Sequence, residues 1–331
     1  MKQNFRWFPL LILVAVTLNL GADNTLSDRL ACLIPYQLFG YRSGKVMNAE
    51  PTLDFTVPVQ NGDGEYLQFF ALGCSGSGNK GQKLVAGRMA AIADQGRIAF
   101  VLYLGDNFYG CGVSSVSDPQ WQTKFEAVYH QPSLQIPFYA ALGNHDYLKN
   151  SQAQVDYTGT QERWRMPDRY YTFSENVAPG VGVDFFAIDT EALLRGKAAE
   201  QIAWLDEKLG QSTARWKLVF GHHPVYTGSP DNDIESEVIR EILEPLFDRH
   251  KIDAYISADS HTLEVHRSPS GLYYIVSGAS SRPRTLRWEE TTVFASAELG
   301  FVLIRLSKTE MTVQFIDAQG GIDYVHTIQH K

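Results

Sequence analysis

The chain has 331 residues, of which 44% are hydrophobic and 20% charged, a composition typical of a globular protein and not of a disordered chain. Its formal net charge is −8 and it has no long basic run, which argues against a nucleic-acid-binding groove or a surface for anionic membranes. An anionic substrate would therefore need a local source of positive charge, such as metal ions. Three cysteines are too few for a disulfide framework.

The N-terminus carries a targeting pattern. Two basic residues precede an apolar run from Phe8 to Leu20, which has the length of the hydrophobic region of a signal peptide and is short for a membrane span. We therefore predict a signal peptide over residues 1–22 and export to the periplasm or the medium, with an uncleaved N-terminal membrane anchor as the alternative. Residues 23–65 are polar and weakly periodic, which predicts an extension ahead of a domain over 66–331.

From Tyr66 onward, short apolar runs alternate with amphipathic stretches, a pattern that predicts an α/β domain with a mainly parallel sheet. The C-terminal third has four further apolar runs with short connections, which predict antiparallel strands. The first set of predicted strands spans 66–73, 99–104, 137–142, 183–188, 216–220 and 254–256, with helices over 81–96, 197–209 and 233–249, and the C-terminal strands span 272–277, 301–306, 311–316 and 324–328.

Polar residues follow the apolar runs at the points where parallel strands end, which is where open α/β sheets place their sites. Aspartate, asparagine, tyrosine and histidine are oxygen and nitrogen donors suited to hard and borderline metal ions. Each motif alone is weak, but five in order, each after an apolar run, predict a metal site. The motifs are Cys74 after the first run, Gly105-Asp106-Asn107-Phe108-Tyr109, Gly143-Asn144-His145-Asp146, Gly221-His222-His223-Pro224 and Ala258-Asp259-Ser260-His261.

These motifs resemble those of the metallophosphoesterases, and in particular of the small, tartrate-resistant-type purple acid phosphatases. The resemblance rests on Gly105–Tyr109, Gly143–Asp146 and the Gly221-His222-x-Pro224-Val225 run, and it extends over about residues 66–320. It implies a four-layer α/β/β/α sandwich of the calcineurin-like type with a dinuclear metal centre between the two sheets. The implied activity is the hydrolysis of phosphate monoesters by an exported acid phosphatase.

The resemblance also implies a role for each matching residue in the metal centre. Asp106 would bridge the two metals, Tyr109 would bind ferric iron, and His261 would complete that first site. Asn144 and His222 would bind the second metal. The implied cofactors are iron together with a second ion of iron, zinc or manganese.

His145 is not a metal ligand in the family that the chain resembles. At this position the family has a histidine that approaches the scissile ester and either protonates the leaving group or holds the phosphate. Two neighbouring metal ions clamp a phosphate, lower the pKa of a water molecule and stabilise the charge that develops in the in-line displacement.

The chain departs from the family pattern at two ligand positions. Cys74 stands where the family has aspartate, and Asp259 stands where it has the first histidine of Gly-His-x-His. The Glu-His pair of the family is also unmatched, since Ser229-Pro230-Asp231 lies there. Asp259 could replace imidazole as an anionic ligand. Three states remain open for Cys74: a thiolate ligand, an inert buried thiol, or a disulfide with Cys111.

Two alternatives to a phosphomonoesterase remain open. The first is a catalytically impaired pseudo-phosphatase that binds a phosphorylated ligand or partner, which the two substituted positions favour and the presence of Asp106, Asn144, His145 and His222 opposes. The second is a phosphodiesterase or nucleotidase on the same fold. The sequence leaves the natural substrate and the oligomeric state open.

Overall fold

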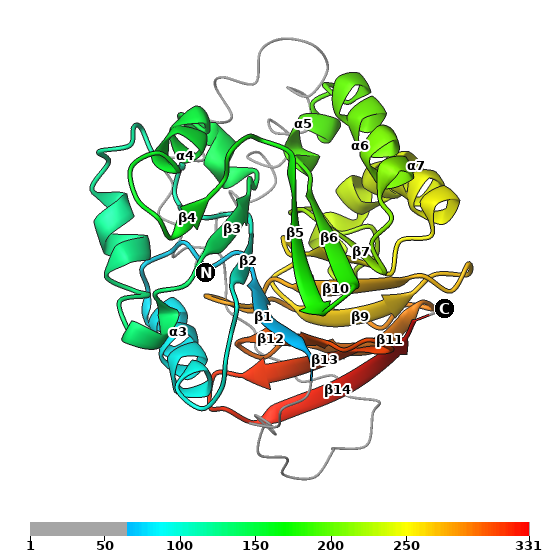
Figure 1. Ribbon diagram of the computed structural model, residues 1–331. Helices are drawn as coiled ribbons and strands as arrows, with labels where there is room; N and C mark the ends of the chain where they lie inside the picture. Colours follow the sequence, from blue (N-terminus) through cyan, green and yellow to red (C-terminus); the bar gives the residue numbers. More distant parts are fainter. Residues whose placement is uncertain (1–64, 331) are drawn as a thin grey trace, which may run out of the picture. The chain divides into compact units, whose positions relative to one another are not determined.

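The computed structural model describes residues 65–330, and the fold is mixed α/β with two seven-stranded sheets (Figure 1). The predicted signal peptide (1–22) and nearly all of the predicted extension (23–65) lie outside the described residues. The first sheet has the order β14 (Ile322–Gln329), β13 (Glu310–Asp317), β12 (Gly300–Leu306), β1 (Leu67–Leu72), β2 (Val101–Leu104), β3 (Phe138–Ala141) and β4 (Trp164–Arg165). The second has the order β11 (Thr292–Ser296), β9 (Leu263–Arg267), β10 (Tyr273–Ser277), β8 (Ala254–Ser257), β7 (Trp216–Phe220), β6 (Val181–Ala187) and β5 (Tyr171–Ala178).

Helices cover the outer faces of the two sheets. Helices α3 (Lys80–Ala93) and α4 (Gln152–Tyr157) lie on the side of the first sheet, and α5 (Thr190–Leu194), α6 (Ala199–Gln211) and α7 (Asp233–His250) lie on the side of the second (Figure 1). A buried cluster joins this second helical layer to the sheet: Leu205 of α6 and Leu243 of α7 pack with Val219, Tyr255 and Tyr274 of the strands. This arrangement confirms the predicted sandwich.

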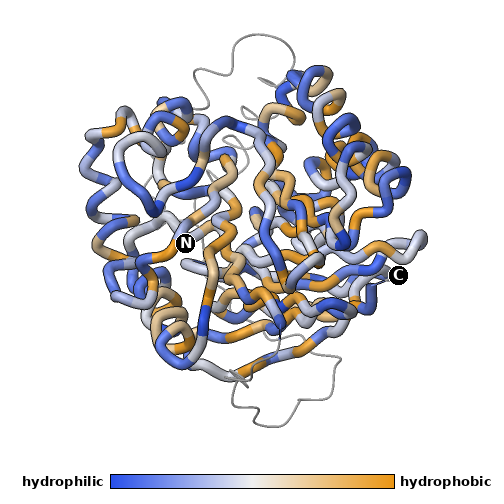
Figure 2. The backbone as a smooth tube through the Cα atoms, viewed as in Figure 1, coloured by the Kyte–Doolittle hydropathy of each residue, from blue (hydrophilic) through white to orange (hydrophobic). Residues whose placement is uncertain are grey.

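Four phenylalanines form the contact between the inner faces of the sheets. Phe69 of β1 and Phe100, which precedes β2, stack at 4.8 Å between ring centroids. Both meet the edge of Phe185 of β6, at 5.4 and 5.3 Å, and Phe185 stacks on Phe173 of β5 at 4.6 Å. Figure 2 shows that hydrophobic residues are concentrated in the strands, whereas the outer helices carry many hydrophilic residues.

The pairing of the strands is more mixed than the sequence predicts. Strands β1, β2, β3 and β4 are parallel, and so are β6, β7, β8 and β10, whereas the remaining pairs are antiparallel. The prediction that 272–277 is an antiparallel strand is wrong in part, because β10 pairs parallel with β8 and antiparallel with β9. Strand β9 escapes prediction because it buries two polar residues, Glu264 and His266, and so lacks an apolar run.

The topology brings the carboxyl ends of β1, β2 and β3 in one sheet and of β7 and β8 in the other to a common edge region, where the candidate ligands follow each strand. Among the residues that the structure describes, no helix combines the length and apolar character needed to cross a membrane.

The aromatic contact between the sheets generates a stability prediction. Phe185→Ala should lower the free energy of unfolding by about 3–5 kcal/mol, because the cavity left beside Phe69, Phe100 and Phe173 forfeits both buried area and ring contacts. Urea unfolding measures this loss. The control is Leu84→Ala, whose side chain is 45% exposed and whose loss should stay within about 0.5 kcal/mol. A loss below about 1 kcal/mol for Phe185→Ala would contradict this account of how the sheets pack.

Candidate metal centre

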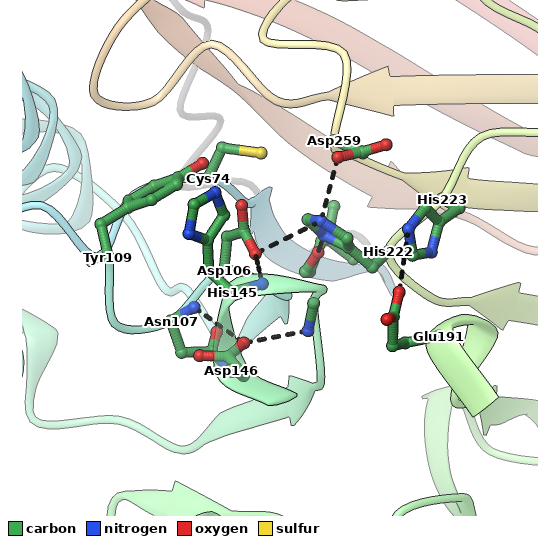
Figure 3. Close-up of polar contacts among 12 residues, drawn as sticks. Cys74, Asp106, Asn107, Tyr109, His145, Asp146, Glu191, His222, His223 and Asp259 are labelled. Atoms are coloured by element: carbon green, nitrogen blue, oxygen red, sulfur yellow. Dashed lines mark hydrogen bonds and ion pairs between the residues drawn. The ribbon is translucent and has the colours of Figure 1, made fainter. Parts of the chain in front are cut away.

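The structure brings the sequence-predicted site residues together at the carboxyl ends of five strands (Figure 3). Each strand end contributes one or two of them. They are Cys74 after β1, Asp106 and Tyr109 after β2, Asn144 and His145 after β3, His222 after β7, and Asp259 and His261 after β8. The ligand atoms of Cys74, Asp106 and His222 all lie within 4.8 Å of one another, and so do those of His222, His223 and Asp259.

Backbone strain is concentrated in these loops. Cys74, Asp106, Asp259 and His261 have φ values of 51°, 54°, 61° and 58°, and Lys251 is the only other non-glycine residue with positive φ in the described part of the chain. The left-handed region is unfavourable for a residue with a Cβ atom, so such conformations persist only where the surrounding structure imposes them. Four candidate ligands therefore owe their positions to a backbone that the fold holds under strain.

Two buried carboxylates flank a single imidazole. The Nε2 atom of His222 lies 3.5 Å from Oδ1 of Asp106 and 3.3 Å from Oδ1 of Asp259. Burial alone would lower the pKa of His222, but the two carboxylates raise it to about 10. Among the described residues no lysine or arginine forms an ion pair with Asp106 or Asp259, so this pocket favours a cation.

Both candidate histidine ligands are anchored through Nδ1. This atom donates to the carbonyl of Leu104 in His222, at 2.7 Å, and to the carbonyl of Arg282 in His261, at 2.6 Å. A carbonyl can only accept, so the neutral rings carry their proton on Nδ1 and present the lone pair of Nε2. This is the arrangement in which a histidine binds a metal, because the bond on the far nitrogen fixes both tautomer and ring orientation.

Tyr109 contacts His261, whereas Cys74 lies in the cluster with Asp106 and His222. The Tyr109 hydroxyl is 3.0 Å from Nε2 of His261, and the tyrosine is buried. Cys74 is a fully buried free thiol, so its pairing with Cys111 is excluded. Burial, together with the negative charges of Asp106 and Asp259, raises the pKa of the Cys74 thiol, so ligation through sulfur would require a metal to displace its proton.

His145 lies at the partly exposed edge of the centre. Its backbone N–H donates to Oδ1 of Asp106 at 3.0 Å, and its Nδ1 faces the carbonyl of Gly110 at 3.0 Å. The ring packs edge-on against Tyr109, with 4.7 Å between centroids. His145 is therefore held against two candidate ligands without pointing its Nδ1 at the metal position.

Asp146 fastens the loop after β2 to the loop after β3. Its buried carboxylate accepts from the backbone N–H groups of Asn107, Phe108 and Gly143, at 3.1, 3.1 and 2.9 Å, and from the side-chain amide of Gln154 at 2.8 Å. Burial and the charge of Asp106 nevertheless raise the pKa of Asp146 to about 6. From the sequence, Asp146 is expected to orient His145 or to cap the next segment, whereas in the structure it joins the loops after β2 and β3.

Asn232 is the residue of the site that the sequence analysis overlooks. It lies just before α7, and its Nδ2 donates to Oδ2 of Asp259 at 2.6 Å. An asparagine ahead of a predicted helix is an ordinary capping signal, so the sequence offered no separate reason to place it at the site.

The donor set fits a pair of transition-metal ions. Nε2 of His222 and Oδ1 of Asn144 are both buried and lack a hydrogen-bond partner among the described residues. Buried polar atoms normally have hydrogen-bond partners, so two that lack one beside clustered carboxylates mark places where a metal cation would bind.

Comparison with known proteins agrees with this geometry. The family model of the calcineurin-like phosphoesterases matches residues 81–263. The chain is 30% identical over 292 residues to purple acid phosphatase 7 of Arabidopsis thaliana, covering 80% of this chain and 87% of that protein. It is 31% identical to human tartrate-resistant acid phosphatase type 5, covering 67% and 76%. A solved structure described as GAP50, the anchor in the inner membrane complex of Plasmodium, superposes with a TM-score of 0.73 at 26% identity, covering 80% and 89%.

The chain therefore belongs to the calcineurin-like phosphoesterase family, and its relatives include purple and tartrate-resistant acid phosphatases. Membership in this family supports a metal-dependent phosphoesterase with a dinuclear centre.

The bond between the two ligand loops generates a prediction about Asp146. Asp146→Asn should lower the free energy of unfolding by about 2–4 kcal/mol, because the new amide nitrogen would face backbone N–H groups and leave buried donors unsatisfied. Denaturant unfolding measures this change in the free energy of unfolding. The matched control is Asp118→Asn, a surface carboxylate that accepts from the N–H groups of Ser114 and Gln120 and should cost less than about 1 kcal/mol. Equal losses in the two variants would refute the special role of Asp146.

Proposed function

We propose that this protein is an acid-phosphatase-type hydrolase of phosphate monoesters that uses two metal ions. The observation that carries the proposal is the pair of buried carboxylates, Asp106 and Asp259, around one imidazole whose Nε2 makes no hydrogen bond within the described part of the chain. Bound metal ions would supply the positive charge that a phosphate requires and would activate a water molecule as the nucleophile.

We assign the ligands to two metals as the family resemblance implies, with Cys74 and Asp259 at the two substituted positions. The first metal would be iron, held by Asp106, Tyr109, His261 and the thiolate of Cys74. The second would be iron, zinc or manganese, held by Asp106, Asn144, His222 and Asp259. Support comes from the Nδ1 bonds of the two histidines to the carbonyls of Leu104 and Arg282, which turn each Nε2 away from the backbone. Further support comes from two clusters of ligand atoms that meet at His222, one with Cys74 and Asp106 and one with His223 and Asp259.

The proton of the leaving group is assigned to His145. The carbonyl of Gly110 accepts from Nδ1, so Nε2 is the atom that would hold and deliver a proton. The bond from its backbone N–H to Asp106 fixes the distance between this acid and the metal position. Positioning of this kind is what general-acid catalysis requires of a side chain.

We further propose that the protein is exported, on the basis of the N-terminal sequence pattern and of relatives that are acid phosphatases. Its substrate would be a phosphate ester small or exposed enough to reach the strand-end loops.

A binding role without turnover is the second candidate. Cys74 and Asp259 replace the ligand types expected from the family resemblance, and one structural relative is described as an anchor in a membrane complex. In this case the chain would bind a phosphorylated ligand or partner through the same loops.

Metal content and turnover together distinguish these candidates. Protein purified from medium supplemented with iron and zinc should contain at least one transition metal per chain and hydrolyse an aryl phosphate, and a chelator should abolish turnover until metal is restored. Elemental analysis and a phosphate-release assay measure the two properties. Absence of bound metal would refute the two-metal proposal, and bound metal without turnover of any phosphate ester would favour the binding role.

His145→Ala generates a prediction about the leaving group. We expect kcat to fall by about 10²–10⁴-fold for alkyl phosphates, whose poor leaving groups need a proton, and much less for activated aryl phosphates. The control is His130→Ala, an exposed histidine that contacts only the carbonyl of Ala127, which should leave both rates unchanged. Equal losses on the two classes of ester would assign His145 to phosphate binding instead.

A further inference from the structure

We propose that Asn232 is a positioning residue that sets the Asp259 carboxylate as a ligand of the second metal. The inference rests on the proposed function, since it concerns how this chain uses Asp259 where the family resemblance leads one to expect histidine. Asn232 is the residue that allows an aspartate to serve at this position in place of histidine.

Asn232 fixes one oxygen of Asp259 and leaves the other toward the metal position. Its Nδ2 donates to Oδ2 of Asp259 at 2.6 Å, whereas Oδ1 of Asp259 lies 3.3 Å from Nε2 of His222. A carboxylate with both oxygens unattached could rotate about its last torsion. With Oδ2 bonded to an amide, Oδ1 is directed at the place where the lone pair of His222 also points.

The orientation of the Asn232 amide is itself determined. The ionised carboxylate of Asp259 can only accept, so the NH₂ group of Asn232 faces it, and Oδ1 of Asn232 accepts from the hydroxyl of Ser229 at 2.7 Å. Ser229 is fully buried, and its backbone N–H donates to Thr227 at 3.0 Å. A continuous chain of hydrogen bonds thus runs from the loop after β7 to the carboxylate after β8.

Asn232 also gives up a local interaction to hold Asp259. It occupies the position before α7 at which an asparagine side chain normally accepts from a backbone N–H of the first turn, yet it makes no such bond. A side chain that does not make its usual local hydrogen bond is often engaged in a long-range interaction instead. For Asn232, that interaction is the hydrogen bond to the carboxylate of Asp259.

The chemistry of the pair is complementary in a way that histidine would not be. A carboxylate offers an acceptor to the amide NH₂ of Asn232, whereas an imidazole bound to a metal through one nitrogen presents an N–H at the other. Asn232 could meet such an N–H only with its amide reversed, which would turn its NH₂ group toward the hydroxyl of Ser229. In the orientation seen here, Asn232 matches the carboxylate of Asp259.

The experiment measures how tightly metal is held. The full-length protein is exposed to increasing chelator concentrations, and the iron, zinc and manganese retained per chain are counted by elemental analysis. In Asn232→Leu one metal should be released at about 10–100-fold lower chelator concentration than in the parent, which is the effect typical of losing the partner of a metal ligand. Asn232→Ser provides a second variant that retains a good helix start but is too short to reach Asp259.

A matched control and a double-mutant cycle separate positioning from general destabilisation. Ser236→Ala removes a hydroxyl that donates to the backbone carbonyl of Asn232 at 2.8 Å, so it perturbs the same helix start and should retain metal as the parent does. In an Asp259→Ala background, Asn232→Leu should cause no further loss of metal, whereas a merely structural role would add its effect. Unchanged metal retention in both Asn232 variants, or additive losses in the cycle, would overturn the inference while the parent still binds metal. A parent without bound metal would overturn the proposed function and this inference together.

Discussion

The negative charge of Asp106 and Asp259, buried on either side of His222, is the constraint on which the site depends. Two carboxylates in a region of low dielectric repel each other and lose their hydration, and one imidazolium balances at most one of them. The two carboxylates raise the pKa of His222 to about 10, because the pocket strongly favours positive charge. A pair of metal ions would satisfy this demand and would also give an acidic protein a place for phosphate.

Holding such groups together requires a backbone that cannot relax. The unfavourable positive φ values of Asp106 and Asp259 persist because each turn follows a strand that is held in one of two packed sheets. The close approach of the loops leaves no room for larger residues: a Cβ atom at Gly143 would lie 2.3 Å from the backbone nitrogen of Asp106. Asp146 supplies acceptors for N–H groups that this approach would otherwise leave unpaired. The strained turns and the hydrogen bonds of Asp146 thus act together to hold the two loops in place.

The sequence predicts ten of the fourteen strands that the structure describes, all but β4, β5, β9 and β11, and the polar motifs at the strand ends, because both are local signals: an apolar run, then a polar motif at its end. It does not predict strand β9, since the mutual bond of Glu264 and His266, at 2.6 Å, is what allows two polar side chains to be buried there. Asn232 is missed for a related reason, because its partner is 27 residues away and its position mimics an ordinary helix cap. Pairings made by single long-range hydrogen bonds leave no periodic trace in the chain.

The two substituted ligand positions bear on whether the site has decayed or has been rebuilt. Decay leaves buried polar groups without partners, at a cost of about 1–3 kcal/mol for each. Asp259 has the opposite character: one oxygen is bonded to Asn232, the other faces His222, and the charges of His223, His222 and His261 hold its pKa below the usual range in spite of burial. An aspartate held ionised in this way has the protonation state that metal binding would require. The imidazole of His222 lies beside both this carboxylate and Asp106, so the substituted position is in direct contact with the part of the centre that matches the family resemblance.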